Sequence, residues 1–206
     1  MTAHRSSRWR ASPQRLMRLL AGLWLFGAGE ALVVHGALGA SPWTVLAQGV
    51  SVQTPLSIGQ ATILISGLVL LLWILLRQRP GLGTLLNAVV IGIAIDVTLE
   101  LVPDDPGLAQ RWASLLVGVA LVAIGSGFYL GAALGPGPRD GLMTGVHRVT
   151  GRPVPHVRLA IEVAALAVGA ALGGTVGIGT LVFAVAIGPA VHVALRFMSP
   201  IAATEM

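Results

Sequence analysis

The sequence has no cysteine and no lysine, and it carries little charge of either sign. Only 10% of its 206 residues are charged, and all 13 basic residues are arginines. The absence of cysteine excludes disulfides, zinc–cysteine sites and thiol catalysis. The net charge of +5 does not indicate a nucleic-acid partner, because the arginines are spread among short polar stretches rather than gathered in a basic domain.

Motifs for nucleotide, metal or nucleophilic chemistry are also missing. The sequence contains no GxxxxGK, HExxH or GxSxG pattern. Gly81-Leu-Gly83 and Gly177-Ile-Gly179 resemble fragments of a nucleotide-binding loop, but they lack its third glycine, and we interpret them as helix starts. We therefore expect a protein that is not an enzyme, with no catalytic residue, no metal site and no cofactor.

Apolar residues, in contrast, are abundant. They make up 55% of the chain, and the mean hydropathy is +0.85. Residues 31–76, 112–138 and 163–195 contain no Asp, Glu, Lys or Arg. Since about 20 apolar residues span a bilayer, and a soluble domain of this size could not bury so many apolar side chains, the sequence predicts an all-α membrane protein in contact with lipid.

Six spanning helices follow from the apolar runs. We place them at residues 16–38, 56–76, 81–102, 112–134, 157–172 and from the glycines at 173–179 to about Arg196. The first run imitates a signal peptide, but its length and its match to 112–134 favour a retained helix. Two further segments, 39–49 and 135–145, are bounded by Gly and Pro and are too short to span. Each would form a short helix, either re-entrant or interfacial.

The two halves of the chain are similar to each other. Residues 14–100 align with 110–196 without a gap, with 29 identities in 87 positions, whereas random pairing at this composition would produce about nine. Each half contains three predicted spans, an odd number, so the second half would insert in the opposite orientation. This arrangement is the 3+3 inverted-topology repeat of many secondary transporters.

The repeat also divides the chain into segments. The predicted order is an Arg-rich cytoplasmic tail (1–15), a first three-helix repeat (16–102), an extracytoplasmic loop (103–111), a second three-helix repeat (112–198) and a cytoplasmic tail (199–206). In this orientation twelve arginines lie on the cytoplasmic side and only Arg111 lies outside. The bias predicts a multi-pass protein of the cell (inner) membrane with both termini in the cytoplasm.

Charged side chains inside apolar runs are the candidate functional residues, because a charge in a bilayer is costly and usually faces a cavity or a partner. The predicted intramembrane polar site consists of Glu30, Asp96, Glu162 and His192. Secondary candidates are Asn87, Glu100, Arg139, Asp140 and Arg158. Asp96 and His192 are equivalent positions of the two halves, and a titrating pair at opposite ends of a pathway would suit proton coupling.

Each candidate also has a structural alternative. Glu30 could be a carboxyl bonded to a neighbouring helix, Glu100 could lie among lipid headgroups, and His192 could be a packing residue. Arg158 and Glu162 share a helix face and could form either a paired charge at an interface or a gate. Arg139 and Asp140 could attract an anion at a helix N-terminus or form a salt bridge in a surface loop.

The short segments and the third span resemble a known family. The resemblance is carried by Gly39-Ala-Ser-Pro-Trp-Thr-Val-Leu-Ala-Gln-Gly49, by the helix from Gly81-Leu-Gly83-Thr84 to Asp96, and by Gly137-Pro-Arg-Asp-Gly-Leu-Met-Thr-Gly145. These segments are similar to those of the YczE/YitT-like bacterial integral membrane proteins, and the YczE-type branch is matched from about residue 16 to 198. The resemblance implies a small inner-membrane protein and brings no functional residues with it.

The function that we predict is a small secondary transporter or exporter of an unknown small molecule or ion. The alternatives are a non-transporting scaffold or regulatory partner of another membrane complex, and a passive channel. A homodimer is one option for six short spans, although no residue pattern selects it. A transporter should contain a polar cavity near mid-membrane that both halves line, whereas a scaffold should tie up Glu30 and Asp96 between helices.

Overall fold

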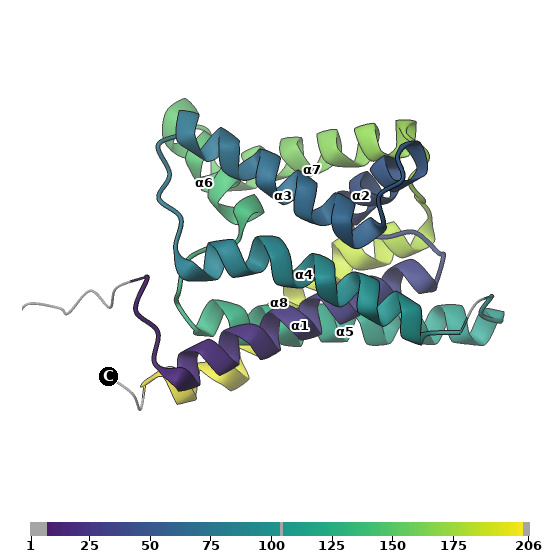
Figure 1. The fold of residues 1–206 in the computed structure, drawn as a ribbon, viewed down its shortest axis with the longest axis horizontal. Helices are drawn as coiled ribbons and strands as arrows, with labels where there is room; N and C mark the ends of the chain where they lie inside the picture. Colours follow the sequence, from purple (N-terminus) through teal and green to yellow (C-terminus); the bar gives the residue numbers. More distant parts are fainter. Residues whose placement is uncertain (1–7, 104, 204–206) are drawn as a thin grey trace, which may run out of the picture.

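The computed structural model describes residues 8–103 and 105–203, and every regular element in them is a helix (Figure 1). The helices are α1 (Pro13–His35), α2 (Pro42–Gln53), α3 (Ile58–Leu75), α4 (Leu82–Leu101), α5 (Leu108–Gly131), α6 (Pro138–Thr150), α7 (Val154–Ala171) and α8 (Ile178–Ala203). Residues 1–7, 104 and 204–206, which belong to the predicted tails and loop, lie outside the described residues.

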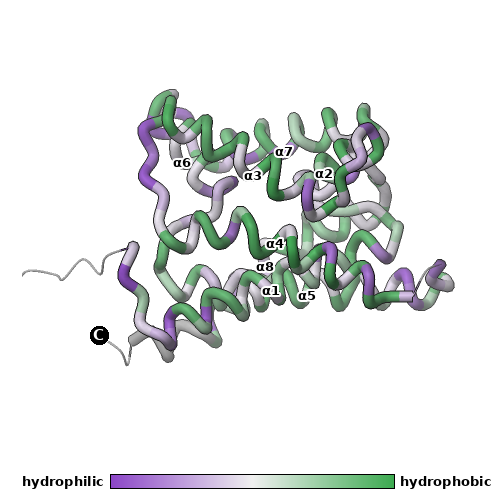
Figure 2. Tube along the Cα trace, viewed as in Figure 1, coloured by the Kyte–Doolittle hydropathy of each residue, from purple (hydrophilic) through white to green (hydrophobic). Residues whose placement is uncertain are grey.

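Six of these helices, namely α1, α3, α4, α5, α7 and α8, are long and apolar enough to cross a membrane. They confirm the predicted all-helical membrane fold. The majority of the helix ends lie within about one helical turn of the predicted boundaries. Apolar residues run along the long helices, and polar residues gather near the two ends of the bundle (Figure 2). The second short helix, α6, extends to Thr150 rather than 145, so His147 and Arg148 lie in its last turn.

Local signals explain where the helices begin. Ser12 and Ser41 each precede a proline at the first helical position, and each side chain accepts a hydrogen bond from the backbone N–H three residues later. Ser57 and Gln60 form a reciprocal capping box at the start of α3. The glycines of Gly81-Leu-Gly83 and Gly177-Ile-Gly179 precede or open α4 and α8, which agrees with their interpretation as helix starts.

The helices form two layers (Figure 1). In one layer α1 and α5 pack together at the centre, with α4 against α1 and α8 against α5. In the other layer α2, α3, α6 and α7 pack in a ring, in which α2 contacts α3 and α7, and α6 contacts the same two helices. The layers meet where α3 packs along α4. In the described residues α7 and α8 make no comparable contact.

The crossing of α1 and α5 is made by glycines. A Cβ on Gly29 would lie 2.6 Å from the carbonyl oxygen of Gly118, and a Cβ on Gly118 would lie 2.6 Å from that of Gly29. Gly22 and Gly125 approach each other equally closely, with distances of 2.8 and 2.5 Å. These contacts show that α1 and α5 run antiparallel, because the earlier glycine of each helix meets the later glycine of the other. Small residues allow this backbone contact.

Each half also supports the last helix of the other half. The backbone N–H of Gly179, in the first turn of α8, donates to the carbonyl oxygen of Leu38 at 2.7 Å. At the equivalent place Gly83 in α4 donates to Leu134 at 2.9 Å. The turns that present these carbonyls contain Gly39 and the glycine at 135, which have φ of 105° and 121°, a region that only glycine adopts without strain.

Gly118→Ala should destabilise the protein, because its Cβ would overlap the Gly29 carbonyl and force α1 and α5 apart. Overpacking of this kind typically costs about 1–3 kcal/mol. Gly67→Ala in α3 is the matched control, since no atom lies within 4 Å of its Cβ and helix propensity alone should stabilise it by about 0.5–1 kcal/mol. Thermal unfolding in detergent, followed by gel filtration, should give a lower midpoint for Gly118→Ala only. Equal midpoints would contradict the crossing described above.

Candidate functional site

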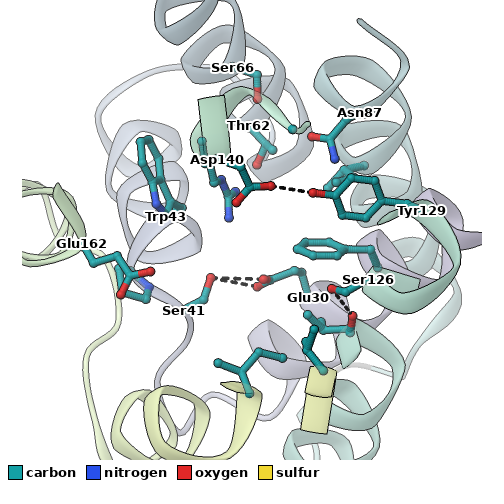
Figure 3. A pocket seen from close by; sticks show the side chains of 18 of the residues that line it. Glu30, Ser41, Trp43, Thr62, Ser66, Asn87, Ser126, Tyr129, Asp140 and Glu162 are labelled. Carbon is teal, nitrogen blue, oxygen red and sulfur yellow. Dashed lines mark hydrogen bonds between the residues drawn. The ribbon is translucent and has the colours of Figure 1, made fainter. Parts of the chain in front are cut away.

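A cavity of about 220 Å³ lies between the two helix layers, and residues of all eight helices or their caps line it (Figure 3). It reaches the middle of the spanning helices, since Phe26 of α1, Ile91 of α4 and Val122 of α5 form part of its wall. Its polar lining residues are Glu30, Ser41, Thr62, Ser66, Asn87, Ser126, Tyr129, Arg139, Asp140, Arg158 and Glu162. The cavity therefore combines polar groups with a largely apolar wall.

Glu30 is the most deeply buried carboxyl group of the cavity, with 1% of its surface exposed. The Ser41 hydroxyl donates to its carboxylate at 3.1–3.2 Å, and the Thr44 hydroxyl donates to Oε2 at 2.7 Å. Ser41 is the N-cap of α2 and Thr44 lies in its first turn, so the carboxylate also faces the positive end of a helix dipole. These donors and the dipole compensate for the loss of water around a buried charge.

In the second half, a carboxylate at the cavity comes from the short helix itself. Ser126 stands at the position equivalent to Glu30, and Asp140 stands at the position equivalent to Thr44. The Tyr129 hydroxyl donates to Asp140 Oδ2 at 2.6 Å, as Figure 3 shows. The first half thus brings Glu30 to the cavity from its first spanning helix, whereas the second half brings Asp140 from its short helix and Glu162 from α7.

Both short helices begin at the cavity and end at the protein surface. Ser41 is 3% exposed, whereas the last residue of α2, Gln53, is exposed. In α6 Asp140 lines the cavity and Thr150 is exposed. The chain therefore enters the protein interior before each short helix and returns to the surface along it.

Arg139 is the basic group nearest the centre of this arrangement. Its guanidinium lies 5.2 Å from the centroid of the Trp43 ring, a distance at which a cation is attracted to the ring face. In the part of the chain that the structure describes, this guanidinium has no hydrogen bond or ion pair within the protein. Glu30, Asp140 and Glu162 line the same cavity. Its N–H donors are thus free to bind a group in the cavity.

Arg158 and Glu162 form an ion pair on α7, with Arg158 Nε 2.9 Å from Glu162 Oε1. This confirms that the two side chains share a helix face. Both residues line the cavity, and the Arg158 side chain is 55% exposed while that of Glu162 is 29% exposed. The pair lies at the rim of the cavity, where it fits either a structural ion pair or a gate.

The structure brings some of the predicted site residues together and leaves others apart. Two of the four primary candidates, Glu30 and Glu162, line the cavity. Of the secondary candidates, Asn87, Arg139, Asp140 and Arg158 line it as well. Asp96, Glu100 and His192 are not among the residues of its wall. Of the two alternatives for Arg139 and Asp140, the structure agrees with the helix N-terminus, because both lie in the first turn of α6.

Asp96 has a different position from the one that the repeat suggested. Its carboxylate accepts hydrogen bonds from the Ser57 hydroxyl at 2.5 Å and from the Gly59 backbone N–H at 2.8 Å. These donors belong to the cap and first turn of α3, so Asp96 fastens α3 to α4. His192 is exposed on α8. The two residues therefore do not face each other across the cavity, since equivalent sequence positions need not carry equivalent contacts.

Several polar residues of the site could not be predicted by searching the apolar runs for charged side chains. Ser41, Thr44 and Tyr129 are neutral, and small hydroxyl groups are common in membrane helices for packing reasons. One signal could have found Ser41, because Ser-Pro is a helix start and places a hydroxyl group at a fixed point. Tyr129 is the one tyrosine of the chain, which by itself does not indicate a site.

Comparison with known proteins places the chain in a family. The Family of unknown function (DUF6198) matches residues 13–196. The chain belongs to this family. It is 39% identical to an uncharacterized protein of Haemophilus influenzae over 94% of the chain and 89% of the relative. It is 36% identical to the uncharacterized membrane protein YczE of Bacillus subtilis, over 87% and 83%, and 29% identical to the uncharacterized protein YyaS of the same organism, over 84% and 88%.

These matches confirm the resemblance to YczE-type membrane proteins. No solved structure matches the chain at a significant level. No cluster of three or more His, Cys, Asp or Glu side chains suited to a metal ion occurs in the described ranges.

Asp96→Ala should lower stability, because it removes both hydrogen bonds that join α3 to α4. Hydrogen bonds to a charged group contribute about 1.5–3 kcal/mol each. Glu100→Ala is the control, since Glu100 is exposed one turn further along the same helix. The unfolding midpoint in detergent should fall for Asp96→Ala and stay unchanged for Glu100→Ala. A midpoint unaffected by Asp96→Ala would show that Asp96 is not a structural contact.

Proposed function

We propose that the protein is a small secondary transporter or exporter of a small polar solute, built as a 3+3 inverted-topology repeat. The observation that carries the proposal is the composition of the cavity wall. Eight pairs of equivalent positions line it: Phe26 and Val122, Glu30 and Ser126, Ser41 and Gly137, Trp43 and Arg139, Thr62 and Arg158, Ser66 and Glu162, Asn87 and Phe183, and Ile91 and Ile187. A site at the interface of two inverted halves is typical of secondary transporters.

The packing of the halves supports the inverted arrangement. The first helices of the two halves, α1 and α5, cross antiparallel, as two segments of opposite membrane orientation must. The contacts of α1 with α4 recur as those of α5 with α8, and those of α2 with α7 recur as those of α3 with α6. The short helices α2 and α6 both direct their N-termini to the cavity. Discontinuous helices of this kind often bind substrate or coupling ions.

The charges in the cavity favour transport over a purely structural role. A scaffold needs close packing between helices, whereas Glu30, Arg139 and Asp140 line a cavity of about 220 Å³. The hydrogen bonds of Asp96 to α3 and of Glu30 to α2 agree with the structural alternative for these two residues. The titratable side chains at the cavity, Glu30, Asp140 and Glu162, are the groups through which proton coupling could operate.

Flux measurements test this proposal. Purified protein in proteoliposomes should accelerate uptake of at least one solute from a broad panel of labelled small metabolites and ions. Glu30→Gln and Arg139→Gln should each reduce the rate about tenfold or more, since a contact to a charged group is lost. Glu100→Gln should leave it unchanged. Uptake no faster than in protein-free liposomes across the panel would favour the scaffold, and flux without exchange stimulation by internal solute would favour the channel.

The membrane orientation has its own test. The arginine bias of twelve to one leads us to propose that both termini are cytoplasmic. A fluorescent protein fused after residue 206 should therefore fluoresce in bacterial cells, and alkaline phosphatase fused there should be inactive. Phosphatase inserted after Asp105 should be active. The opposite pattern at both sites would reverse the orientation.

A further inference from the structure

Spanning helices of the two layers are fastened to each other on one side only, where α3 packs on α4, while α7 and α8 make no comparable contact in the described residues. On the fastened side, Gly59 of α3 lies against α4, where its Cβ would be 2.1 Å from the Gly92 carbonyl oxygen, and Asp96 binds the first turn of α3. At the equivalent positions on the other side, the residues are Pro155, Gly188 and His192.

None of these three residues can make the contacts that join α3 to α4. Pro155 has no backbone N–H to donate, and His192 is exposed. No atom lies within 4 Å of a Cβ built on Gly188. Between α7 and α8 the bundle therefore lacks the contacts that join α3 to α4.

The cavity extends to this side of the bundle, between α7 and α8. Arg158 and Glu162 of α7 and Phe183, Ile187 and Val191 of α8 belong to the cavity wall, although the two helices do not pack along each other. Because α7 and α8 are both long enough to span the membrane, a gap between them faces the bilayer rather than the water on either side. Its α8 wall is apolar and its α7 wall carries an ion pair, so the gap suits a molecule with an apolar part and a charged part.

The centre of the cavity suits a headgroup with charges of both signs. The free donors of Arg139 can bind an anionic oxygen, and the N-termini of α2 and α6 add positive potential beside it. Trp43 lines the cavity and its ring faces the Arg139 guanidinium. The carboxylates of Glu30 and Asp140 lie on the same cavity and can bind an ammonium group. A volume of about 220 Å³ accommodates a small headgroup but not acyl chains, which would have to remain in the gap.

We propose that the cavity takes up the zwitterionic headgroup of a membrane amphiphile through the α7–α8 gap, with the anionic group at Arg139, the ammonium group at Glu30 and Asp140, and the apolar chain between α7 and α8. This inference rests on the proposed function, because it names the substrate class of the same site. It concerns binding and can be measured without flux.

The test uses photoreactive lipids in nanodiscs of phosphatidylglycerol, because phosphatidylcholine is itself zwitterionic and would compete for the cavity. Phosphatidylethanolamine, phosphatidylglycerol and diacylglycerol, each with a diazirine in one acyl chain, are added to the protein, and labelled residues are mapped by mass spectrometry. Phosphatidylethanolamine should label Phe183 and Ile187 most strongly. Arg139→Gln should reduce this labelling about tenfold or more, while Arg139→Lys should retain most of it. Labelling of Leu72, exposed on α3, should not change in either variant.

Two further measurements distinguish the headgroup of a membrane lipid from the same headgroup free in water. Since the chain has no cysteine, Pro155→Cys/Gly188→Cys can be bridged selectively by a bifunctional methanethiosulfonate, and the bridge should prevent labelling at Ile187, whereas the same reagent on either single variant should not. Glu30→Gln should bring phosphatidylethanolamine labelling down to the level of phosphatidylglycerol. Free phosphoethanolamine should not compete at millimolar concentration.

The outcomes distinguish this inference from the proposed function. Labelling at Ile187 that is unaffected by both Arg139→Gln and the bridge would identify ordinary boundary lipid and overturn the inference. Competition by free phosphoethanolamine that persists in the bridged protein would identify a water-soluble ligand and also overturn it. Specific labelling without solute flux would support the inference and contradict only the transport of the panel solutes. Flux without specific labelling would contradict the inference alone.

Discussion

Backbone contact between α1 and α5 is the constraint on which the rest of the structure depends. In a bilayer the hydrophobic effect does not drive helices together, and close packing of small residues takes its place. Gly22, Gly29, Gly118 and Gly125 allow the two helices to approach until backbone meets backbone. Since α4 packs on α1 and α8 on α5, this single crossing positions the whole inner layer and thereby one wall of the cavity.

The same framework carries two different sets of polar side chains. The glycines of the crossing and of the supporting turns recur in both halves, whereas the cavity positions have diverged, with Trp43 opposite Arg139 and Glu30 opposite Ser126. Conserving the framework preserves the space between the layers, because each glycine there is in contact with backbone. Divergence of the lining makes that space chemically asymmetric, with acidic groups supported by hydroxyl donors and one basic group stacked on an indole.

Much of the fold could be predicted from the sequence, and less of the site. The spanning helices follow from long uncharged runs, and the short helices follow from segments such as 39–49 that are bounded by Gly and Pro. Glu30 and Glu162 were predictable as site residues because a charge in an apolar run needs a partner or a cavity. Asp96 satisfies the same criterion but bonds to the start of α3, and the criterion does not separate these two outcomes. Thr44 carries no such signal.

The sequence by itself determined that the chain is an all-helical membrane protein of six spans, that its halves are related, and which charges lie inside apolar runs. These properties are local, since hydropathy and helix length depend on neighbouring residues. Only the tertiary structure decided which charges meet. Arg139 lies over Trp43, ninety-six positions away, and α7 stays apart from α8 while α3 packs on α4. Such contacts depend on how helices rotate and cross, which is decided by packing between segments far apart in the chain.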